Sequence, residues 1–69
     1  MILEVLDAAG SRLDFVVVDL QSSEAARREA RKLLDDLGPA QARARRVVAR
    51  DRGRTAYEWR ALALLGGVR

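Results

Sequence analysis

The first twenty residues form two apolar runs separated by a turn signal, a pattern that predicts a β-hairpin. Residues 2–8 are apolar and partly alternating, and residues 12–20 contain three consecutive valines. β-branched side chains favour strands, and Ala9-Gly10-Ser11 is typical of a turn. We therefore expect two strands joined by a loop of three or four residues around Gly10.

The second of these strands is apolar on both faces. Side chains alternate along a strand, which places one set of apolar residues on each side: Leu13, Phe15 and Val17 on one face, and Val16, Val18 and Leu20 on the other. One face is expected to pack against the chain's own helix. A second subunit is a candidate cover for the other.

Residues 23–37 carry the apolar spacing of an amphipathic helix. Ser22 or Ser23 can act as the N-cap, and Glu24 places a negative charge in the first turn. The apolar stripe consists of Ala26, Ala30, Leu33, Leu34 and Leu37. Opposite charges four residues apart on the other side predict the pairs Glu24–Arg28, Arg31–Asp35 and Lys32–Asp36. Gly38 and Pro39 end the helix.

Residues 40–65 fit two patterns, of which we favour a second hairpin. Its strands run from about Arg43 to Arg50 and from Thr55 to about Leu64, with residues 51–54 as the turn. The second strand begins with clear alternation, with Tyr57, Trp59 and Ala61 on one face and Glu58 and Arg60 on the other.

The alternative for this segment is a pair of helices. Helical spacing also fits Ala40, Ala44, Val47 and Val48, and Thr55 with Glu58 matches a capping box in a helix that Gly66 could end. Alanine and arginine favour helices, but both are abundant throughout this chain, so their helix propensity discriminates little.

The predicted fold is therefore α+β, with the order ββαββ and a four-stranded antiparallel sheet carrying one helix on a face. The alternative is an N-terminal β-hairpin followed by three helices, the last two spaced like a helix-turn-helix. A chain of 69 residues forms one small domain. Residues 66–69 are expected to be a mobile tail.

The amino-acid composition excludes most kinds of catalytic site. The chain has no Cys and no His, so thiol nucleophiles, the usual metal sites and the usual general base are missing. Its serines have no base to activate them, and its glycines form no phosphate loop. We expect no enzyme activity, no metal, no cofactor and no small-molecule substrate. Without a long apolar run or a basic N-terminal segment, no membrane association is expected, and the predicted location is cytoplasmic.

Small size favours self-association. A domain of this length buries only about 60% of its unfolded surface, and neither disulfides nor metals are present to strengthen it. Oligomerisation is the remaining common remedy, so we expect a homodimer or a higher homo-oligomer.

Charge is divided unevenly along the chain. Residues 1–36 hold five basic and eight acidic residues, a net charge of −3, whereas residues 37–69 hold eight basic and two acidic residues, a net charge of +6. Arginine offers a planar fork that suits phosphate and carboxylate groups. The candidate contacts for nucleic acid or an acidic partner are Arg43, Arg45, Arg46, Arg50, Arg52, Arg54 and Arg60.

Apolar and aromatic residues of the predicted strands are the candidates for a protein interface: Phe15, Val16, Val18, Tyr57 and Trp59. In so small a domain, its lone Tyr and Trp are better suited to a core or dimer interface than to base stacking. The sequence thus favours a self-associating interaction module without catalytic activity. The alternative is a basic nucleic-acid-binding module that uses residues 43–54.

Overall fold

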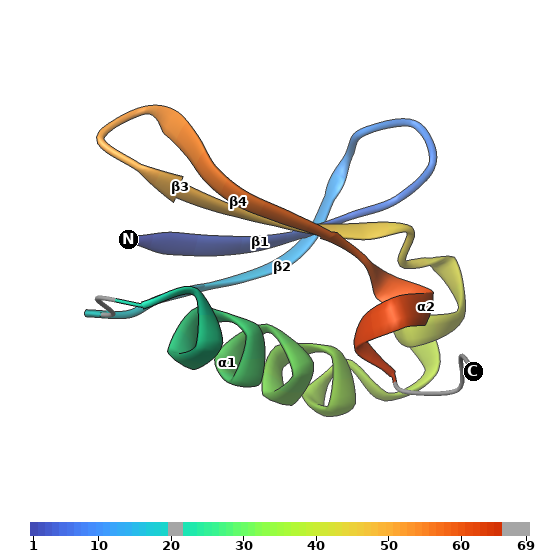
Figure 1. The fold of residues 1–69 in the computed structure, drawn as a ribbon. Helices are drawn as coiled ribbons and strands as arrows, with labels where there is room; N and C mark the ends of the chain where they lie inside the picture. The colour runs from blue at the N-terminus through green and yellow to red at the C-terminus, as the bar shows by residue number, and fades with distance from the viewer. Residues whose placement is uncertain (20–21, 66–69) are drawn as a thin grey trace.

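Four strands form one antiparallel sheet with the main helix along one face. The computed structural model describes residues 1–19 and 22–65. The elements of this part are β1 (Ile2–Leu6), β2 (Arg12–Val17), α1 (Ser23–Asp36), the 3₁₀ helix η1 (Gly38–Arg43), β3 (Arg46–Asp51), β4 (Arg54–Arg60) and α2 (Ala61–Leu64). The strand order is β2-β1-β3-β4, and α1 runs beneath the sheet with α2 near its C-terminal end (Figure 1). The ββαββ prediction is confirmed, and the alternative with three helices after the hairpin is wrong because β3 and β4 are extended.

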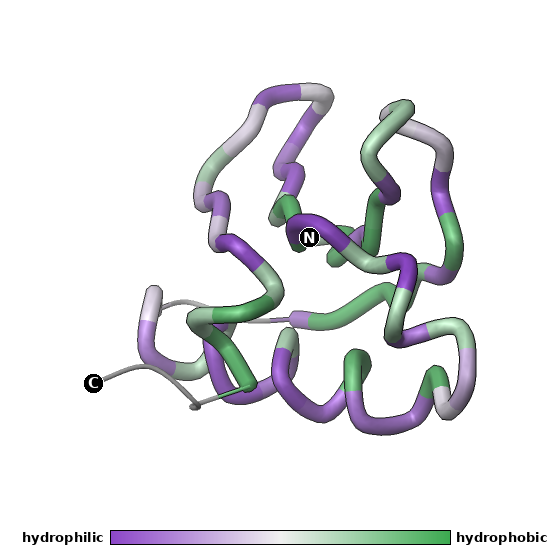
Figure 2. The backbone as a smooth tube through the Cα atoms, turned by 90° about the vertical axis from the view of Figure 1, so that its right-hand side faces the viewer, coloured by the Kyte–Doolittle hydropathy of each residue, from purple (hydrophilic) through white to green (hydrophobic). Residues whose placement is uncertain are grey.

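Helix α1 forms where the apolar spacing predicted a helix. The Oγ of Ser22 accepts a hydrogen bond from the backbone N–H of Ala25 at 3.2 Å, so Ser22 is the N-cap. The stripe buries Ala26, Ala30, Leu33 and Leu34. Hydrophobic stretches alternate with hydrophilic ones along this helix, as expected of an amphipathic element (Figure 2). None of the three predicted pairs is within ion-pair distance in the described residues. Instead Lys32 pairs with Glu29 at 3.4 Å.

The core lies between α1 and the sheet face that we call the inner face. On that face Leu3 and Val5 of β1 lie opposite Ala49 and Val47 of β3, and all four are 0% exposed. Ala30, Leu33 and Leu34 of α1 belong to the same cluster. Burying each large apolar side chain contributes about 1.5–3 kcal/mol. The inner face therefore provides most of the stability of the domain.

The third strand begins later than predicted. Residues 38–43 form η1, and β3 starts at Arg46, so the predicted start at Arg43 is wrong. Gly38, with φ +61°, ends α1, and Pro39 follows at a helix-start position that its fixed φ favours. Gln41 secures this short turn, because its Nε2 donates to the carbonyl oxygen of Leu34 at 3.0 Å.

The fourth strand ends earlier than predicted. It stops at Arg60, and residues 61–64 form α2 rather than more strand. In a strand Ala61 and Leu64 would point to opposite faces, whereas in a helix they share one. Both are buried, at 3% and 2% exposure. Helix formation therefore lets both residues close one end of the core.

The first hairpin differs from expectation in its loop and in one side chain. Residues 7–11 separate the strands, and the Asp7 carboxylate accepts from the N–H groups of Ala9 and Ser11 at 2.9 Å each. A register shift between Val5 and Leu6 interrupts the alternation opposite them. Leu13 consequently packs against the core instead of sharing a face with Phe15 and Val17.

Two further predictions concern the end of the second strand and the C-terminal residues. Strand β2 ends at Val17 rather than continuing to residue 20, which lies outside the described residues together with the predicted tail at 66–69. Across residues 1–19 and 22–65, no helix combines the length and apolar character needed to cross a bilayer.

Candidate interaction surface

The sheet face turned away from α1, which we call the outer face, exposes a group of apolar side chains. Ile2 is 37% exposed, Phe15 48% and Val17 67%. Ile2 and Val17 are direct cross-strand partners, and Phe15 lies two residues from Val17 on the same side of β2. These three residues form what we call the apolar patch, which lies at the β2 side of the sheet.

A charged network borders the patch and crosses the outer face. Glu4 accepts from the Nε of Arg50 at 2.6 Å and from an Nη of Arg12 at 3.1 Å. Arg12 also lies over the ring of Phe15, 4.5 Å from its centroid. Glu4 therefore links β2, β1 and β3 through side chains.

A second ion pair lies farther along the same face. An Nη of Arg46 donates to Glu58 at 3.0 Å, joining β3 to β4. Both residues are about half exposed, so this pair contributes little to folding stability. It does place one more positive and one more negative group on the outer face.

The environment of Glu4 keeps it ionised. Its side chain is only 15% exposed. The hydrogen bond from Arg50 is the main cause that lowers the pKa of Glu4 from its ordinary 4.5, with Arg12 adding to the effect, while burial opposes it. At neutral pH the network therefore consists of a carboxylate held between two guanidinium groups.

The centre of the outer face is buried although no helix covers it. Val48 is 2% exposed and Leu6 is 5% exposed, and both follow the alternation onto this side. Val48 lies between Glu4 and Glu58 in the cross-strand register. The turns of both hairpins rise on the side away from α1 (Figure 1). Charged side chains and the curvature of the sheet thus shield the centre of the outer face from solvent, whereas the apolar patch stays exposed.

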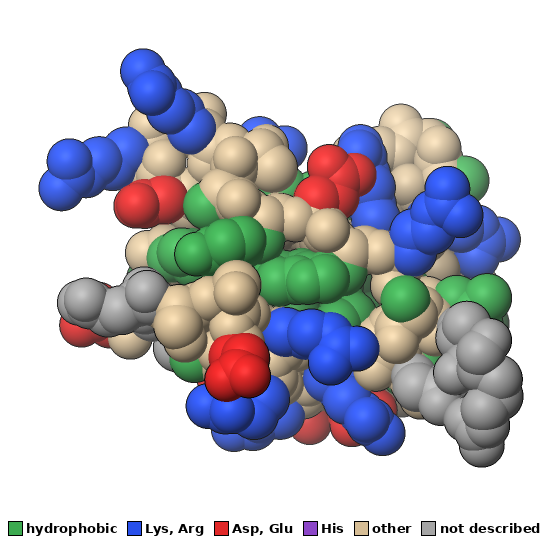
Figure 3. All heavy atoms as spheres, viewed as in Figure 1, with side chains coloured by type: hydrophobic (Ala, Val, Ile, Leu, Met, Phe, Trp, Pro, Cys, Tyr) green, Lys and Arg blue, Asp and Glu red, His purple; other side chains and the backbone are tan. Residues whose placement is uncertain are grey.

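The seven candidate arginines do not form one surface. Arg46, Arg50 and Arg60 lie on the outer face, where Arg46 and Arg60 are cross-strand partners. Arg52 and Arg54 flank Gly53 at the turn between β3 and β4. Basic side chains accordingly occupy several separate places in Figure 3.

Arg43 and Arg45 lie apart from both groups. Arg43 ends η1 and Arg45 precedes β3, so neither lies on the strand that was predicted to start at about Arg43. The guanidinium of Arg45 donates to the carbonyl oxygens of Ala42 and Ala44, at 3.2 Å each. Arg45 thus binds its own chain beside the start of β3.

The five candidate interface residues are divided between the two faces. Only Phe15 lies on the outer face. Val16, Val18, Tyr57 and Trp59 are half-buried and pack against the inner core. The rings of Tyr57 and Trp59 stack on each other, with centroids 5.8 Å apart and planes at 28°. Their location on the helix side separates them from the apolar patch.

Ile2, Val17, Glu4 and Arg12 were not among the sequence-based candidates. Alternation did group Phe15 with Val17. The missing information was the register, because Ile2 and Val17 become neighbours only once the two strands are aligned. Opposite charges on paired strands are a signal that could have suggested that alignment.

Clustered acidic residues could indicate a metal site, and similarity to known proteins could indicate a family. Among residues 1–19 and 22–65, no group of three or more acidic residues lies together as potential metal ligands. A scan against protein-family models finds no match, and searches of curated proteins and of solved structures find no similar protein.

Proposed function

We propose that this chain is a small interaction module that associates with a second copy of itself through the outer face of its sheet. The proposal rests on the apolar patch, three large side chains exposed side by side on the sheet face opposite α1. Clustered exposed apolar side chains are typical of protein interfaces. Phe15 belongs to the aromatic residues that are enriched at protein interfaces.

Charge on the outer face supports a second copy as the partner. The face carries both arginines and glutamates, including Arg12, Glu4 and Glu58. A twofold contact brings the same surface together with itself, and a surface carrying both signs can complement its own copy. A partner of a single charge would meet repulsion from one set of these groups.

The size of the molecule is compatible with a dimer contact. Its two longer extents, 28 and 26 Å, give a cross-section of roughly 700 Å², comparable to the about 800 Å² that each partner contributes to a standard interface. Since the chain contains no cysteine for a disulfide, burial against a copy is an effective way to stabilise so small a domain.

The free edge of β2 is protected against pairing with another strand, which favours contact through the sheet face over extension of the sheet. The N–H of Val18 donates to the carbonyl oxygen of Met1, just before β1, so alternation points the N–H of Phe15 away from the sheet. That N–H donates to the Asp14 carboxylate at 2.8 Å. A charged side chain on an edge-strand donor opposes pairing with another strand.

Sedimentation of matched variants tests the proposal. Val17 and Leu62 are 67% and 69% exposed, but Val17 is on the outer face and Leu62 is on α2. We expect the native chain and Leu62→Arg to sediment as dimers of twice 7.6 kDa, and Val17→Arg to sediment as a monomer with unchanged circular dichroism. A monomeric native chain at high concentration, or equal dissociation by both variants, would contradict the proposal.

Nucleic-acid binding is a second candidate, favoured by the exposed turn between β3 and β4. Arg52 and Arg54 are both exposed there, and an arginine-rich turn can contact phosphates. The variant Arg52→Glu/Arg54→Glu is expected to lose binding to duplex DNA or single-stranded RNA while dimerisation persists. If the native chain binds neither more tightly than about micromolar at low salt, where phosphate contacts are strongest, this candidate fails.

A further inference from the structure

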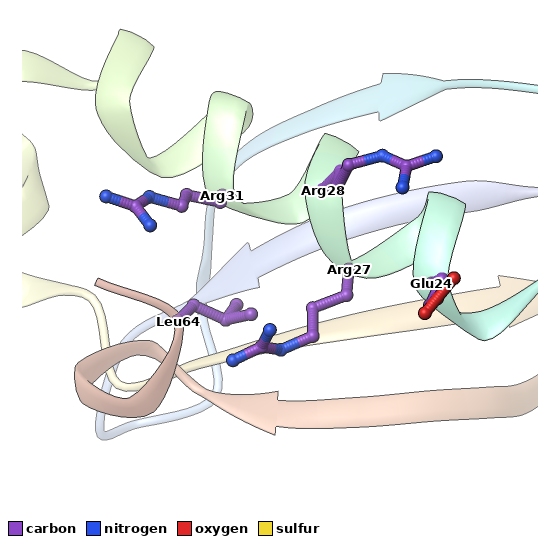
Figure 4. Close-up of a pocket in the computed structure, with 5 residues that line it drawn as sticks. All are labelled: Glu24, Arg27, Arg28, Arg31 and Leu64. Carbon is purple, nitrogen blue, oxygen red and sulfur yellow. The ribbon is translucent and has the colours of Figure 1, made fainter. Parts of the chain in front are cut away.

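A separate cleft lies on the helix side of the molecule, between α1 and α2. Its volume is about 270 Å³, and it is lined by Glu24, Arg27, Arg28, Arg31 and Leu64. Four of these residues come from α1 and one from α2 (Figure 4). Because the outer face is on the other side of the sheet, this cleft is independent of the proposed dimer contact.

Two of the arginines extend toward the same end of the cleft. Arg27 and Arg31 are one helical turn apart and therefore lie on one side of α1. Figure 4 shows both side chains directed toward the side of Leu64, whereas Arg28 points the other way. The cleft thus has a basic end, formed by two guanidinium groups beside an apolar side chain.

These arginines have no acidic partner in the described part of the chain. The ion pairs within 4.0 Å there involve Arg12, Lys32, Arg46 and Arg50, and none involves an arginine of the cleft. Glu24 lines the opposite end but makes no such pair with Arg27 or Arg28.

Helix stability does not account for this concentration of charge. The helix dipole favours acidic residues near the N-terminus and basic residues near the C-terminus. In α1, Arg27 and Arg28 lie in the N-terminal half and Arg31 lies just past the middle, while the last turn holds Asp35 and Asp36 and no basic residue. The acidic last turn thus runs against the dipole, and the dipole does not explain the arginines.

We propose that the basic end of this cleft binds a phosphate group, either as free phosphate or carried by a small organic molecule. The planar forks of Arg27 and Arg31 can each donate two hydrogen bonds to phosphate oxygens. Their aliphatic stems offer an apolar surface for an organic body beside the largely buried Leu64. A volume of about 270 Å³ is just below the range of sites for drug-sized ligands, which restricts the ligand to a small one.

NMR titration of the native full chain tests this inference. Inorganic phosphate and phenyl phosphate are added separately at constant ionic strength. We expect saturable shifts at Arg27, Arg31 and Leu64 with either probe. Tighter binding of phenyl phosphate identifies an organic phosphate as the preferred source, and equal binding identifies free phosphate. Shifts absent from these residues at millimolar probe would overturn the site.

Matched double variants separate a built site from general attraction to positive charge. Arg27→Gln/Arg31→Gln should weaken phosphate binding at least about tenfold, because the loss of even one charge-assisted hydrogen bond has an effect of that size. Arg52→Gln/Arg54→Gln removes the same charge at the β3–β4 turn and should leave affinity within about twofold, because exposed distant charges are screened by salt. Equal weakening by the two variants would overturn the proposal. Neither double variant changes a residue of the apolar patch, so both variants should still form dimers.

Discussion

The inner and outer faces of the sheet are built from alternate residues of the same strands, yet they differ in what covers them and in the charges they carry. On β1, Leu3 and Val5 point inward and are fully buried, while Ile2 and Glu4 point outward, one partly exposed and the other ion-paired. The inner face is uncharged at its centre and covered by α1. The outer face combines an exposed apolar patch with arginines and glutamates and is uncovered.

This difference separates residues that fold the domain from residues available for binding. The inner face is built from apolar side chains that pack against α1 of the same chain. The outer face retains exposed apolar area that folding alone does not remove. Substitutions on the two faces should therefore affect different measurements.

The largest expected effect is on the inner face. Leu3→Ala should destabilise the domain by about 2–5 kcal/mol, because it removes buried methyl groups and leaves a cavity. A domain of this length has a total stability of only about 3–10 kcal/mol. We expect a largely unfolded variant in urea titrations followed by circular dichroism. The control Val17→Ala, on the outer face, should lower monomer stability by less than about 0.5 kcal/mol; equal losses would erase the distinction between the faces.

A smaller effect is expected for the charged network. Glu4→Gln leaves Arg12 and Arg50 without their shared carboxylate and should cost about 1 kcal/mol of unfolding free energy. Glu58→Gln is the matched control, because Glu58 pairs with one arginine and is 48% exposed; its cost should be within about 0.5 kcal/mol. A larger loss for the Glu58 variant in the same urea titration would contradict the central role of Glu4.

The same network gives stability a pH dependence. Because the folded pKa of Glu4 is lowered below 4.5, its contribution is present above the unfolded pKa and is lost as pH falls through the folded value. The native chain should lose more stability than Glu4→Gln when acidified from pH 7 to below about 4. Parallel losses in the two proteins would show that Glu4 makes no special contribution.

The smallest expected effect is at a turn that belongs to neither face. Arg52 has φ +53° in the two-residue turn before β4, a conformation that favours glycine. Arg52→Gly should raise stability by about 0.5 kcal/mol and the melting temperature by about 2–4 °C. Arg54→Gly, at the start of β4, should lower stability instead, since glycine weakens a strand. A gain from both variants would point to relief of charge repulsion rather than of backbone strain.

Much of the fold could be predicted because local pattern determined it. The apolar spacing of α1, its serine cap and the Gly38-Pro39 stop fixed the helix, and alternation around Tyr57 identified β4. The errors arose where local pattern competed with packing. The alternation at the start of β4 was extended through the apolar residues 61–64, but these form a helix in which Ala61 and Leu64 are buried together.

The apolar patch could be predicted only in part. The alternation that grouped Phe15 with Val17 is a local property. Their proximity to Ile2 depends on strand register, which the irregularity opposite Val5 and Leu6 sets. The arginine-lined cleft depends on the position of α2, which the sequence pattern did not reveal.

The most direct test of the central claim is an isotope-filtered NMR experiment on a mixture of ¹³C-labelled and unlabelled chains. If the outer faces meet, we expect intermolecular contacts between the methyl groups of Ile2 and Val17 and the ring of Phe15, with none to α1. Intermolecular contacts confined to α1 or α2, or no such contacts in a sample that sediments as a dimer, would show that the outer face is not where two copies meet.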